Sequence, residues 1–401
     1  MLKVCLITTN LLPVPNVLGG AIESLVTNLI KEQEKNAKID LTIVSIYNKE
    51  AQIESKKYQK TNFIYIKKNL KYIFFGIIYN LSNKIFKTNF NTYNHMVLSK
   101  IKHHQYDFIL AEGGHYESYY NFLKYYNRNQ LILHLHHQGS SNEIIDKTFS
   151  RVLGVSDFVT YDFANTSNGI EPYCLRNGIR LDNFDIEVTD KEKVEIRDKY
   201  GLTKDDFIVL FCGRLIKEKG VLELIKAIKR IDNKNIKLLI LGNNPFLKES
   251  KDEYIEKLNK EVLNYEDRII FTGYVNNYDV YKYYKTADIV CIPSVWEDAA
   301  TLVCVEAMVC KKPVLATKSG GIPEHLESYS SIIVEKEKKL VENLEKGILK
   351  FYKNKDNLEK IGLKGYEHGC QFNSHNMYLN LVKYLKVFDK ENKKECEKNE
   401  V

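Results

Sequence analysis

Residues 293–324 combine acidic and small residues with an apolar helix pattern, an arrangement that suits phosphate chemistry. They follow an apolar strand predicted at 287–292. Asp298 falls in a short loop, and Glu306 lies eight residues later in a predicted helix. A helix N-terminus presents unpaired N–H groups and a positive dipole end, which favour a phosphate. An acid one to two turns into such a helix can reach a sugar hydroxyl beside it. The same pattern also occurs in α/β proteins that bind nothing at this position.

A second loop, residues 213–220, reads GRLIKEKG and follows an apolar strand predicted at 207–212. Arg214 and Lys219 are five residues apart on this glycine-bounded loop. Together they could clamp a diphosphate, arginine as a fork and lysine as a point charge. A solvated basic loop is the alternative.

Gly19 and Gly20 lie between a strand predicted at residues 2–9 and a helix predicted at 21–34. Glycine lets a backbone approach a phosphate closely, and the following helix adds its dipole. The pair is not a GxGxxG motif, so an ordinary loop remains the alternative.

Three histidines gather at the end of a strand predicted at residues 131–135: His134, His136 and His137. That end of an open α/β sheet faces the ligand crevice. Strand alternation places His134 and His136 on one face and His137 on the other. We expect His136, and His137 second, to contact a sugar; purely structural histidines are the alternative. No suitably spaced carboxylate is evident as a partner for a metal.

The elements that position these residues alternate between apolar strands and helices, which predicts parallel sheets covered on both faces. The pattern restarts near residue 177, so we expect an N-terminal Rossmann-like domain at 1–170 and a second at 171–368. A helix at 369–388 is expected to pack back on the N-terminal domain. The charged tail at 389–401 lacks an apolar face, so it is predicted to be frayed. The predicted strands are 2–9, 41–45, 62–66, 108–111, 131–135, 151–155, 207–212, 236–241, 268–272, 287–292, 313–317 and 331–334.

Charge is unevenly distributed, although the net charge is only +7. Residues 55–106 contain ten lysines and no acid, with bulky apolar residues interleaved. The segment 67–87 therefore suits an anionic membrane surface. A lysine-rich composition around a buried helix explains the pattern equally well. Nucleic acid is not an expected partner, because no arginine-rich recognition helix is present.

Eight cysteines without a Cys-x-x-Cys pair predict buried free thiols in a reducing compartment. The N-terminal strand is too short for a signal peptide, and no apolar run approaches 18 residues. These features predict a cytoplasmic protein, soluble or peripheral at the inner face of the membrane.

Several motifs together resemble retaining glycosyltransferases of family 4. Residues 293–324 keep the PS, EAM, PV and GG elements and the final Glu of that family's signature, and residues 213–220 keep GR and KG in register. NGI at 177–179 and FTGYV at 271–275 also match. The chain departs with Asp298 at the first acid position, Ala300-Thr301 for Phe-Gly, Lys311 for Gly, and GNN at 242–244 for G-x-G.

This resemblance implies a GT-B fold, in which two Rossmann-like domains face a central cleft. The implied activity is metal-independent, retaining transfer from a nucleotide-diphosphate sugar to a saccharide acceptor, without a cofactor. The lysine-rich segment points to a lipid-linked acceptor, as in capsule or other cell-surface polysaccharide synthesis.

The resemblance also assigns roles to residues. Glu306 would bind the ribose, Asp298 a hydroxyl of the donor sugar, and His136 that sugar. Gly19 and Gly20 would lie against the donor. The departing diphosphate would be stabilised by Arg214, Lys219 and the N–H groups near Thr301, Leu302 and Val303.

Two other classes of protein remain open. A non-catalytic nucleotide-sugar- or carbohydrate-binding protein could use the same fold and would explain the departures from the family pattern. A phosphorylase or epimerase is the other option, although pyridoxal-type phosphorylases are expected to be much longer.

Overall fold

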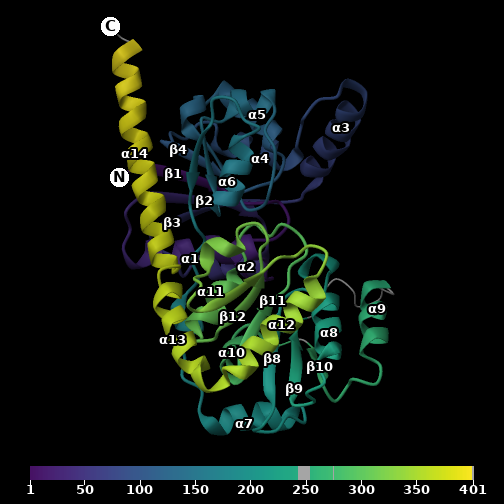
Figure 1. Cartoon of the computed structure of the whole chain (residues 1–401). Helices are drawn as coiled ribbons and strands as arrows, with labels where there is room; N and C mark the ends of the chain where they lie inside the picture. Colours follow the sequence, from purple (N-terminus) through teal and green to yellow (C-terminus); the bar gives the residue numbers. More distant parts are fainter. Residues whose placement is uncertain (243–252, 274, 400–401) are drawn as a thin grey trace. The chain divides into compact units, whose positions relative to one another are not determined.

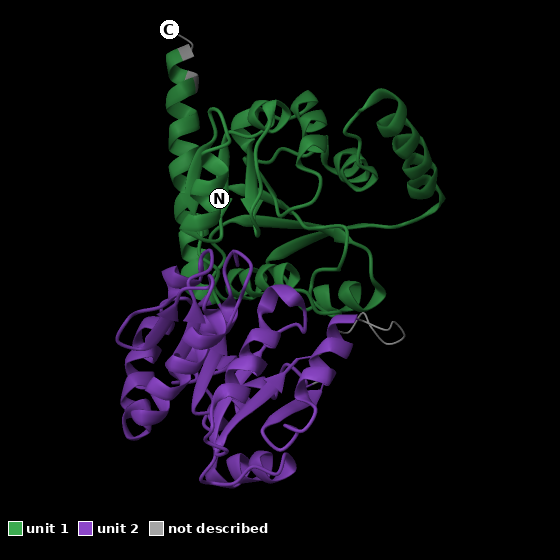
Figure 2. Cartoon of the chain, turned by 45° about the vertical axis from the view of Figure 1, so that its right-hand side comes forward, with its two compact units in different colours: residues 1–178, 374–401 green, residues 179–373 purple. Residues whose placement is uncertain are grey.

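The computed structural model describes residues 1–242, 253–273 and 275–399 (Figure 1). It divides the chain into two compact units (Figure 2). Unit 1 contains residues 1–178 and 374–401, and unit 2 contains residues 179–373. Motif positions 243, 244 and 274 lie outside the described residues.

Unit 1 is built on a seven-stranded sheet in which every pairing is parallel. The strand order reverses between β1 and β4, so this is the switch point of the sheet. In spatial order the strands are β3 (Thr61–Ile66), β2 (Asp40–Ile46), β1 (Lys3–Ile7), β4 (Phe108–Ala111), β5 (Leu131–Leu135), β6 (Arg151–Gly154) and β7 (Glu171–Cys174).

Helices connect these strands and cover the sheet, as parallel crossovers require. The 3₁₀ segment η1 (Tyr116–Lys124) follows β4. The α-helices are α1 (Ala21–Lys35), α2 (Lys49–Ser55), α3 (Leu70–Phe86), α4 (Thr92–Ile101), α5 (Glu143–Thr148), α6 (Asp157–Ala164) and α14 (Ser374–Asn399).

Unit 2 repeats this design with a six-stranded parallel sheet whose switch point lies between β8 and β11. Its strands, in spatial order, are β10 (Ile269–Gly273), β9 (Ile236–Leu241), β8 (Phe207–Cys212), β11 (Ile289–Ile292), β12 (Val314–Thr317) and β13 (Ser331–Val334). Its helices are α7 (Asp190–Lys199), α8 (Val221–Arg230), α9 (Glu253–Val262), α10 (Val280–Thr286), α11 (Leu302–Val309), α12 (Leu340–Lys353) and α13 (Leu358–Gly369).

The core of unit 2 lies on both faces of its sheet. Val209 and Phe211 of β8 belong to one buried cluster, whereas Ile208 and Leu210 belong to another. Side chains on a strand alternate between faces, so a strand buried on both sides reads as a continuous apolar run. The predicted α/β class with two parallel sheets is therefore confirmed.

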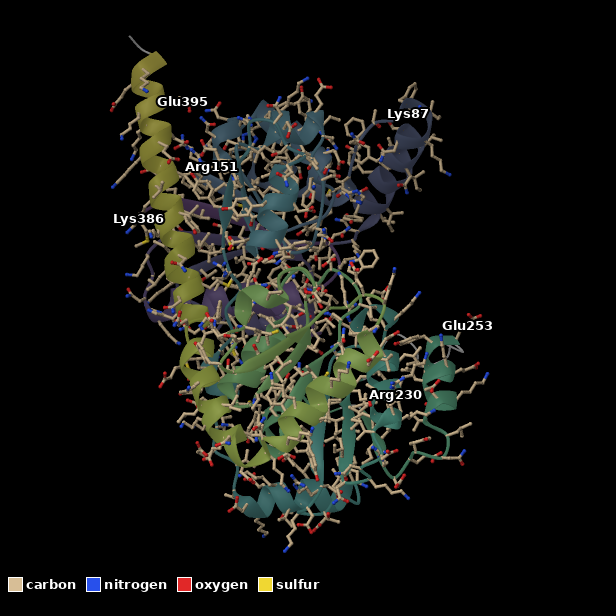
Figure 3. The ribbon with its side chains drawn as sticks, in the orientation of Figure 1. Lys87, Arg151, Arg230, Glu253, Lys386 and Glu395 are labelled. Atoms are coloured by element: carbon tan, nitrogen blue, oxygen red, sulfur yellow. The ribbon has the colours of Figure 1, made fainter. Side chains whose placement is uncertain are left out.

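Helix α14 extends beyond the predicted end of regular structure and contacts other parts of unit 1. The tail predicted to be frayed at 389–401 is instead helical as far as Asn399. Polar groups of β6 and the segment before β5 hold it (Figure 3): Arg151 lies 3.0 Å from Glu391, and Asn129 donates to Glu395 at 2.7 Å. The prediction of a frayed tail was wrong because the tail is held by residues far away in the sequence, which its composition does not reveal.

Within the lysine-rich residues 55–106, helix α3 has no buried residue, whereas α4 has six, so burial of the apolar residues 73–86 is not what the structure shows. Helix α3 contacts α4 within unit 1 through aromatic pairs, with the Phe75 and His95 rings 4.6 Å apart. Its remaining apolar side chains face solvent: Leu70, Ile73, Phe74, Ile77, Ile78, Leu81, Ile85 and Phe86.

Cysteines in the described part of the chain carry free thiols, and four of these residues are buried: Cys5, Cys291, Cys304 and Cys310. Among the described residues, no helix combines the length and apolar character needed to cross a membrane.

Candidate functional site

The two candidate donor segments of unit 2 meet at the switch point of its sheet. Strands β8 and β11 are neighbours, and residues 213–220 and 293–298 follow their carboxyl ends. The loops are joined by a hydrogen bond from the Val295 N–H to the Glu218 carbonyl at 3.0 Å. The structure thus brings together two loops 80 residues apart, at the place where open α/β sheets bind ligands.

Two glycines allow the loops to approach this closely. Gly220 has φ 71°, and a Cβ there would lie 1.8 Å from the Pro293 carbonyl oxygen. Gly320 has φ 50°, and its Cβ would lie 2.2 Å from the Asp298 carbonyl oxygen. Both positions require a left-handed backbone and leave no room for a side chain, so any other residue would displace the Asp298 loop.

Lys219 and Asp298 form an ion pair, with Nζ 2.6 Å from Oδ2. The Ser294 hydroxyl donates to the same oxygen at 3.1 Å. Burial alone would raise the pKa of Asp298, but Lys219 and the hydrogen bonds outweigh it, so the pKa lies below its ordinary value. Two residues with separate predicted roles thus form one charged unit.

Glu297, the neighbouring acid, has a different role. Its Oε2 accepts the Gly320 N–H at 2.5 Å, and its Oε1 contacts Lys336. These bonds tie the acid loop to the segments after β12 and β13. Asp298, and not Glu297, is therefore the acid in register with Lys219.

Glu306 lies on α11 and accepts a hydrogen bond from the Tyr284 hydroxyl at 2.8 Å. Burial raises the pKa of Glu306, and the Tyr284 bond offsets this only in part. Cys212, at the end of β8, is close enough for burial and the Glu306 charge to raise its pKa to about 12. The carboxylate is thus held among weakly acidic groups, and burial is the main influence on its pKa.

Arg214 and the start of α11 are available to a ligand. The Arg214 side chain is exposed and makes no ion pair with another described residue. Helix α11 begins at Leu302 after Thr301, so the N–H groups of Leu302 and Val303 belong to its first turn. First-turn N–H groups lack partners within their own helix, so they can receive an anion.

Unit 1 contains the histidine cluster at the carboxyl ends of β4 and β5. Glu112 follows β4, and its Oε2 lies 2.8 Å from Nδ1 of His134 and 2.7 Å from Nε2 of His136. His137 is exposed on the other side. Glu112 was not among the residues predicted from the sequence, although it is an acid directly after a strand that neighbours the histidine strand, and this position was a usable signal.

The charge state of Glu112 fixes the histidine tautomers. Burial alone would raise the pKa of Glu112, but His134 and then His136 outweigh it and hold the pKa at about 2. An ionised carboxylate only accepts hydrogen bonds, so Nδ1 of His134 and Nε2 of His136 both carry protons. Burial and then His134 lower the pKa of His136. Near neutral pH, His136 therefore has a neutral ring with Nδ1 as an acceptor.

This cluster could also hold a metal ion. Ligand atoms of Glu112, His134 and His136 lie within 4.8 Å of one another. Oε1 of Glu112 and Nε2 of His134 are buried and lack a hydrogen-bond partner in the described part of the chain. Histidine nitrogen and carboxylate oxygen are suitable ligands for a transition metal.

Gly19 and Gly20 lie at the start of α1, with φ 90° and 99°. A Cβ on Gly20 would lie 2.1 Å from Oε2 of Glu23, whose other oxygen accepts the Thr9 hydroxyl at 3.0 Å. Burial raises the pKa of Glu23, while its bond to its own N–H opposes this. A carboxylate therefore lies beside the glycine pair that the sequence predicts to contact a donor.

Comparison with known proteins finds a family match in the C-terminal part of the chain. Residues 192–368, all within unit 2, match the family model for glycosyl transferases group 1. These residues are therefore similar to a glycosyl transferase group 1 domain. The matched region contains Arg214, Lys219, Asp298 and Glu306, whereas His136 and the glycine pair lie outside it.

Two curated relatives match parts of the chain. The uncharacterized glycosyltransferase MJ1607 of Methanocaldococcus jannaschii is 36% identical over 37% of this chain and 37% of its own length. The capsular polysaccharide biosynthesis glycosyltransferase CapM of Staphylococcus aureus is 29% identical over 42% of this chain and 43% of its own. The chain thus spans less than half the length of these two curated relatives.

Structural similarity to solved proteins covers more of the chain than the family match does. HepE of Anabaena, solved in complex with UDP-glucose, superposes with a TM-score of 0.73 at 16% identity, covering 96% of this chain and all of that one. This likeness concerns the fold and confirms the predicted GT-B architecture of two parallel-sheet domains.

Proposed function

We propose that this protein is an enzyme, a retaining glycosyltransferase that moves a sugar from a nucleotide-diphosphate sugar to a lipid-linked saccharide. The product would belong to a capsule or another cell-surface polysaccharide. The observation that carries the proposal is the Lys219–Asp298 pair at the switch point of unit 2, in the region that matches glycosyl transferases group 1. CapM, a capsular relative, and HepE, a structural neighbour bound to UDP-glucose, support the donor and product classes.

The chemical step needs charge stabilisation on the leaving diphosphate. Lys219 is held in place by Asp298, and Arg214 is exposed on the same loop. Together with the N–H groups of Thr301, Leu302 and Val303, they would stabilise the negative charge as it develops. Donors fixed before the reaction cost little reorganisation, which makes this kind of stabilisation effective.

Acids and a histidine would orient the donor. Glu306 would accept the ribose hydroxyls, since the Tyr284 hydroxyl occupies only one side of its carboxylate. Asp298 would accept a hydroxyl of the transferred sugar through the oxygen that Lys219 leaves free. His136 would contact that sugar, with its ring fixed by Glu112. Gly19 and Gly20 would lie against the donor.

We also propose that transfer needs no metal or cofactor, because lysine, arginine and helix N–H groups supply the charge that a metal would otherwise provide. Screening nucleotide sugars for release of nucleoside diphosphate tests this proposal and identifies the donor. Release should persist in EDTA and fall at least about 100-fold in Lys219→Ala, the scale seen when one transition-state donor is removed.

The controls separate catalysis from binding. Lys217→Ala removes an exposed lysine from the same loop and should leave release unchanged. Full activity of Lys219→Ala would refute the donor site, and loss of activity in EDTA would refute metal independence. Donor binding without release from any nucleotide sugar would instead identify a non-catalytic nucleotide-sugar-binding protein.

We further propose that α3 contacts the anionic inner face of the cell membrane from the cytoplasm. Eight of its bulky apolar side chains are exposed, and Lys67, Lys68 and Lys71 lie at its start. Apolar side chains insert at the headgroup boundary, and each nearby lysine adds about 1 kcal/mol on an anionic surface.

Vesicle binding tests this contact. Reversing Lys67, Lys68 and Lys71 to Glu should weaken binding to phosphatidylglycerol vesicles by about 100-fold or more. Reversing Lys191, Lys199 and Lys204 to Glu changes the net charge equally and serves as the matched control. Equal binding by both triple variants would show that α3 is not the contact.

A further inference from the structure

A pocket of about 340 Å³ lies in unit 1 between α3 and residues 88–93, apart from the residues assigned above. Asn10 lines it from the segment after β1, and His115 and Glu117 from the segment after β4. These segments follow the carboxyl ends of the two strands at the switch point. The pocket thus lies at the ligand-binding edge of the sheet, and its volume falls in the usual range of about 300–1,000 Å³.

The pocket has the chemistry of a site for an uncharged, hydroxyl-rich ligand. No lysine or arginine occurs among its described lining residues, so it offers no cation to a phosphate. Each asparagine offers two N–H donors and a carbonyl acceptor, which match sugar hydroxyls that both donate and accept. Five asparagines line it: Asn10, Asn80, Asn83, Asn89 and Asn91.

One wall of the pocket is fixed by its own hydrogen bonds. Asn83 of α3 accepts from the Thr88 hydroxyl at 2.8 Å and the Phe90 N–H at 3.0 Å, and it donates to the Phe90 carbonyl at 2.9 Å. The Phe90 ring stacks on Tyr79 with centroids 4.9 Å apart. The loop is thus held against α3, with two aromatic rings beside the amides.

Other amides in the same wall remain available. The side chains of Asn80 and Asn89 are exposed and make no hydrogen bond within the part of the chain that the structure describes. Asn83 holds the loop in place, so these two side chains can bind a ligand without unfolding the wall. A pre-formed pocket with free polar groups loses little entropy on binding.

We propose that this pocket binds the uncharged saccharide end of the acceptor, while the apolar side chains of α3 outside the pocket contact its lipid chain. This inference rests on the proposed function and adds the acceptor site to it. Helix α3 joins the two parts: Tyr79, Asn80 and Asn83 line the pocket, whereas Phe74 and Ile77 are exposed outside it.

Gly76 of α3 provides a way to fill the pocket. A Cβ at Gly76 would meet one neighbouring atom within 4 Å, Oγ1 of Thr92, another lining residue, at 3.7 Å. Alanine therefore fits in ordinary contact and favours the helix. A longer side chain at the same position extends into the space between α3 and Thr92. Gly76→Leu blocks the pocket, and Gly76→Ala is its matched control.

The experiment measures binding of octyl glycosides of glucose, galactose and N-acetylglucosamine to the full chain, by saturation-transfer NMR below their micelle concentrations. Octanol and the free sugars are run beside them. Wild type and Gly76→Ala should bind at least one glycoside equally, more tightly than octanol or the free sugar. Gly76→Leu and the double variant Asn80→Ala/Asn89→Ala should each lose at least tenfold.

Each outcome bears on the proposal. Failure of all three glycosides to bind the wild type, undiminished binding by Gly76→Leu, or equal binding of octanol would overturn it. UDP binding and nucleotide-sugar hydrolysis, measured on the same variants, should be unchanged. If glycosides bind in the pocket while no nucleotide sugar is ever consumed, the saccharide site stands, and the proposed transferase activity and the acceptor role both fail.

Discussion

At the scale of single residues, opposite charges organise the candidate donor site before any ligand arrives. Lys219 and Asp298 come from two loops and keep each other in place, so neither needs to be ordered by the donor. Removing one partner leaves the other partly buried and unpaired. The resulting loss in the free energy of unfolding exceeds what the ion pair itself contributes. The pair is therefore best probed by activity rather than stability.

Glu306 offers a prediction in which stability and binding change in opposite directions. Burial raises the pKa of Glu306, so the folded state holds its proton more tightly than the unfolded state. As pH rises from the ordinary pKa through the raised one, ionisation of Glu306 therefore lowers the free energy of unfolding. At neutral pH, Glu306→Gln should match or exceed the wild type in stability, yet bind UDP at least about tenfold more weakly, because the neutral amide accepts ribose hydroxyls less strongly.

Trp296 can report this binding, since it is the one tryptophan in the sequence and lies 64% exposed two residues before Asp298. A fluorescence titration with UDP gives the affinity, and urea unfolding gives the stability. Glu218→Gln, at an exposed acid of the facing loop, should change neither. Wild-type affinity in Glu306→Gln would rule out the ribose assignment.

Sequence reasoning could nominate candidate residues in unit 2 because their motifs are local. It did not find the Lys219–Asp298 pair, because 79 residues separate the partners and pairing depends on which strands become neighbours. Glu112 was missed for the same reason: its bonds to His134 and His136 exist only because β4 and β5 are adjacent. Side-chain types are readable from sequence, but contacts across strands follow from topology.

At the scale of elements, the end of α11 adopts an unusual backbone. Lys311 follows this helix with φ 61°, a left-handed conformation that suits glycine, which is the residue usual there in the resembled family. A non-glycine residue there is strained by roughly 1–2 kcal/mol. The family difference noted from sequence thus corresponds to a strained helix end.

Lys311→Gly should therefore raise the free energy of unfolding of unit 2 by roughly 0.5–1 kcal/mol, after subtracting the entropy that glycine loses on folding. Lys311→Ala is the control, since it removes the same exposed contact with Glu187 but keeps the strain. Urea titrations followed by Trp296 fluorescence give the difference. Equal stability of the two variants would show that the left-handed backbone costs nothing at this position.

Among the elements, strand prediction succeeded where strands are apolar and central. β7 was missed because Glu171–Cys174 is short, contains Pro172 and lies at the sheet edge, where its residues are at least partly exposed. For α3, the apolar pattern was recognised, but composition could not decide between a buried and an exposed helix. Only the packing on one side, against α4, answers that question.

At the scale of the whole molecule, α14 completes unit 1 from the far end of the chain. Its hydrogen bonds reach α1, where the Ser374 hydroxyl donates to Glu32 at 3.2 Å, and β7, where the Tyr384 hydroxyl donates to the Cys174 carbonyl at 2.9 Å. Farther along, Glu391 and Asn392 contact Arg151, which is itself buried. The helix is thus a structural part of unit 1.

Deleting residues 389–401 should lower the free energy of unfolding of unit 1 by about 1–3 kcal/mol, because it removes hydrogen bonds to a buried guanidinium. Deleting only 396–401 keeps Glu391, Asn392 and Glu395 and should have little effect. Hydrogen exchange of β6 and β7 peptides measures the change. Equal protection in both truncations would show that the end of α14 does not support the sheet.

The contact between α14 and α1 also constrains how the protein forms during synthesis. The hydrogen bond between Glu32 and Ser374 cannot form until the ribosome has added Ser374, 342 residues after Glu32. At about 5–20 residues per second, this delay is roughly 20–70 s. Unit 2 is continuous in sequence and is synthesised completely within that interval. The C-terminal sheet can therefore fold first, while the earlier-made half remains without its last helix and open to chaperones.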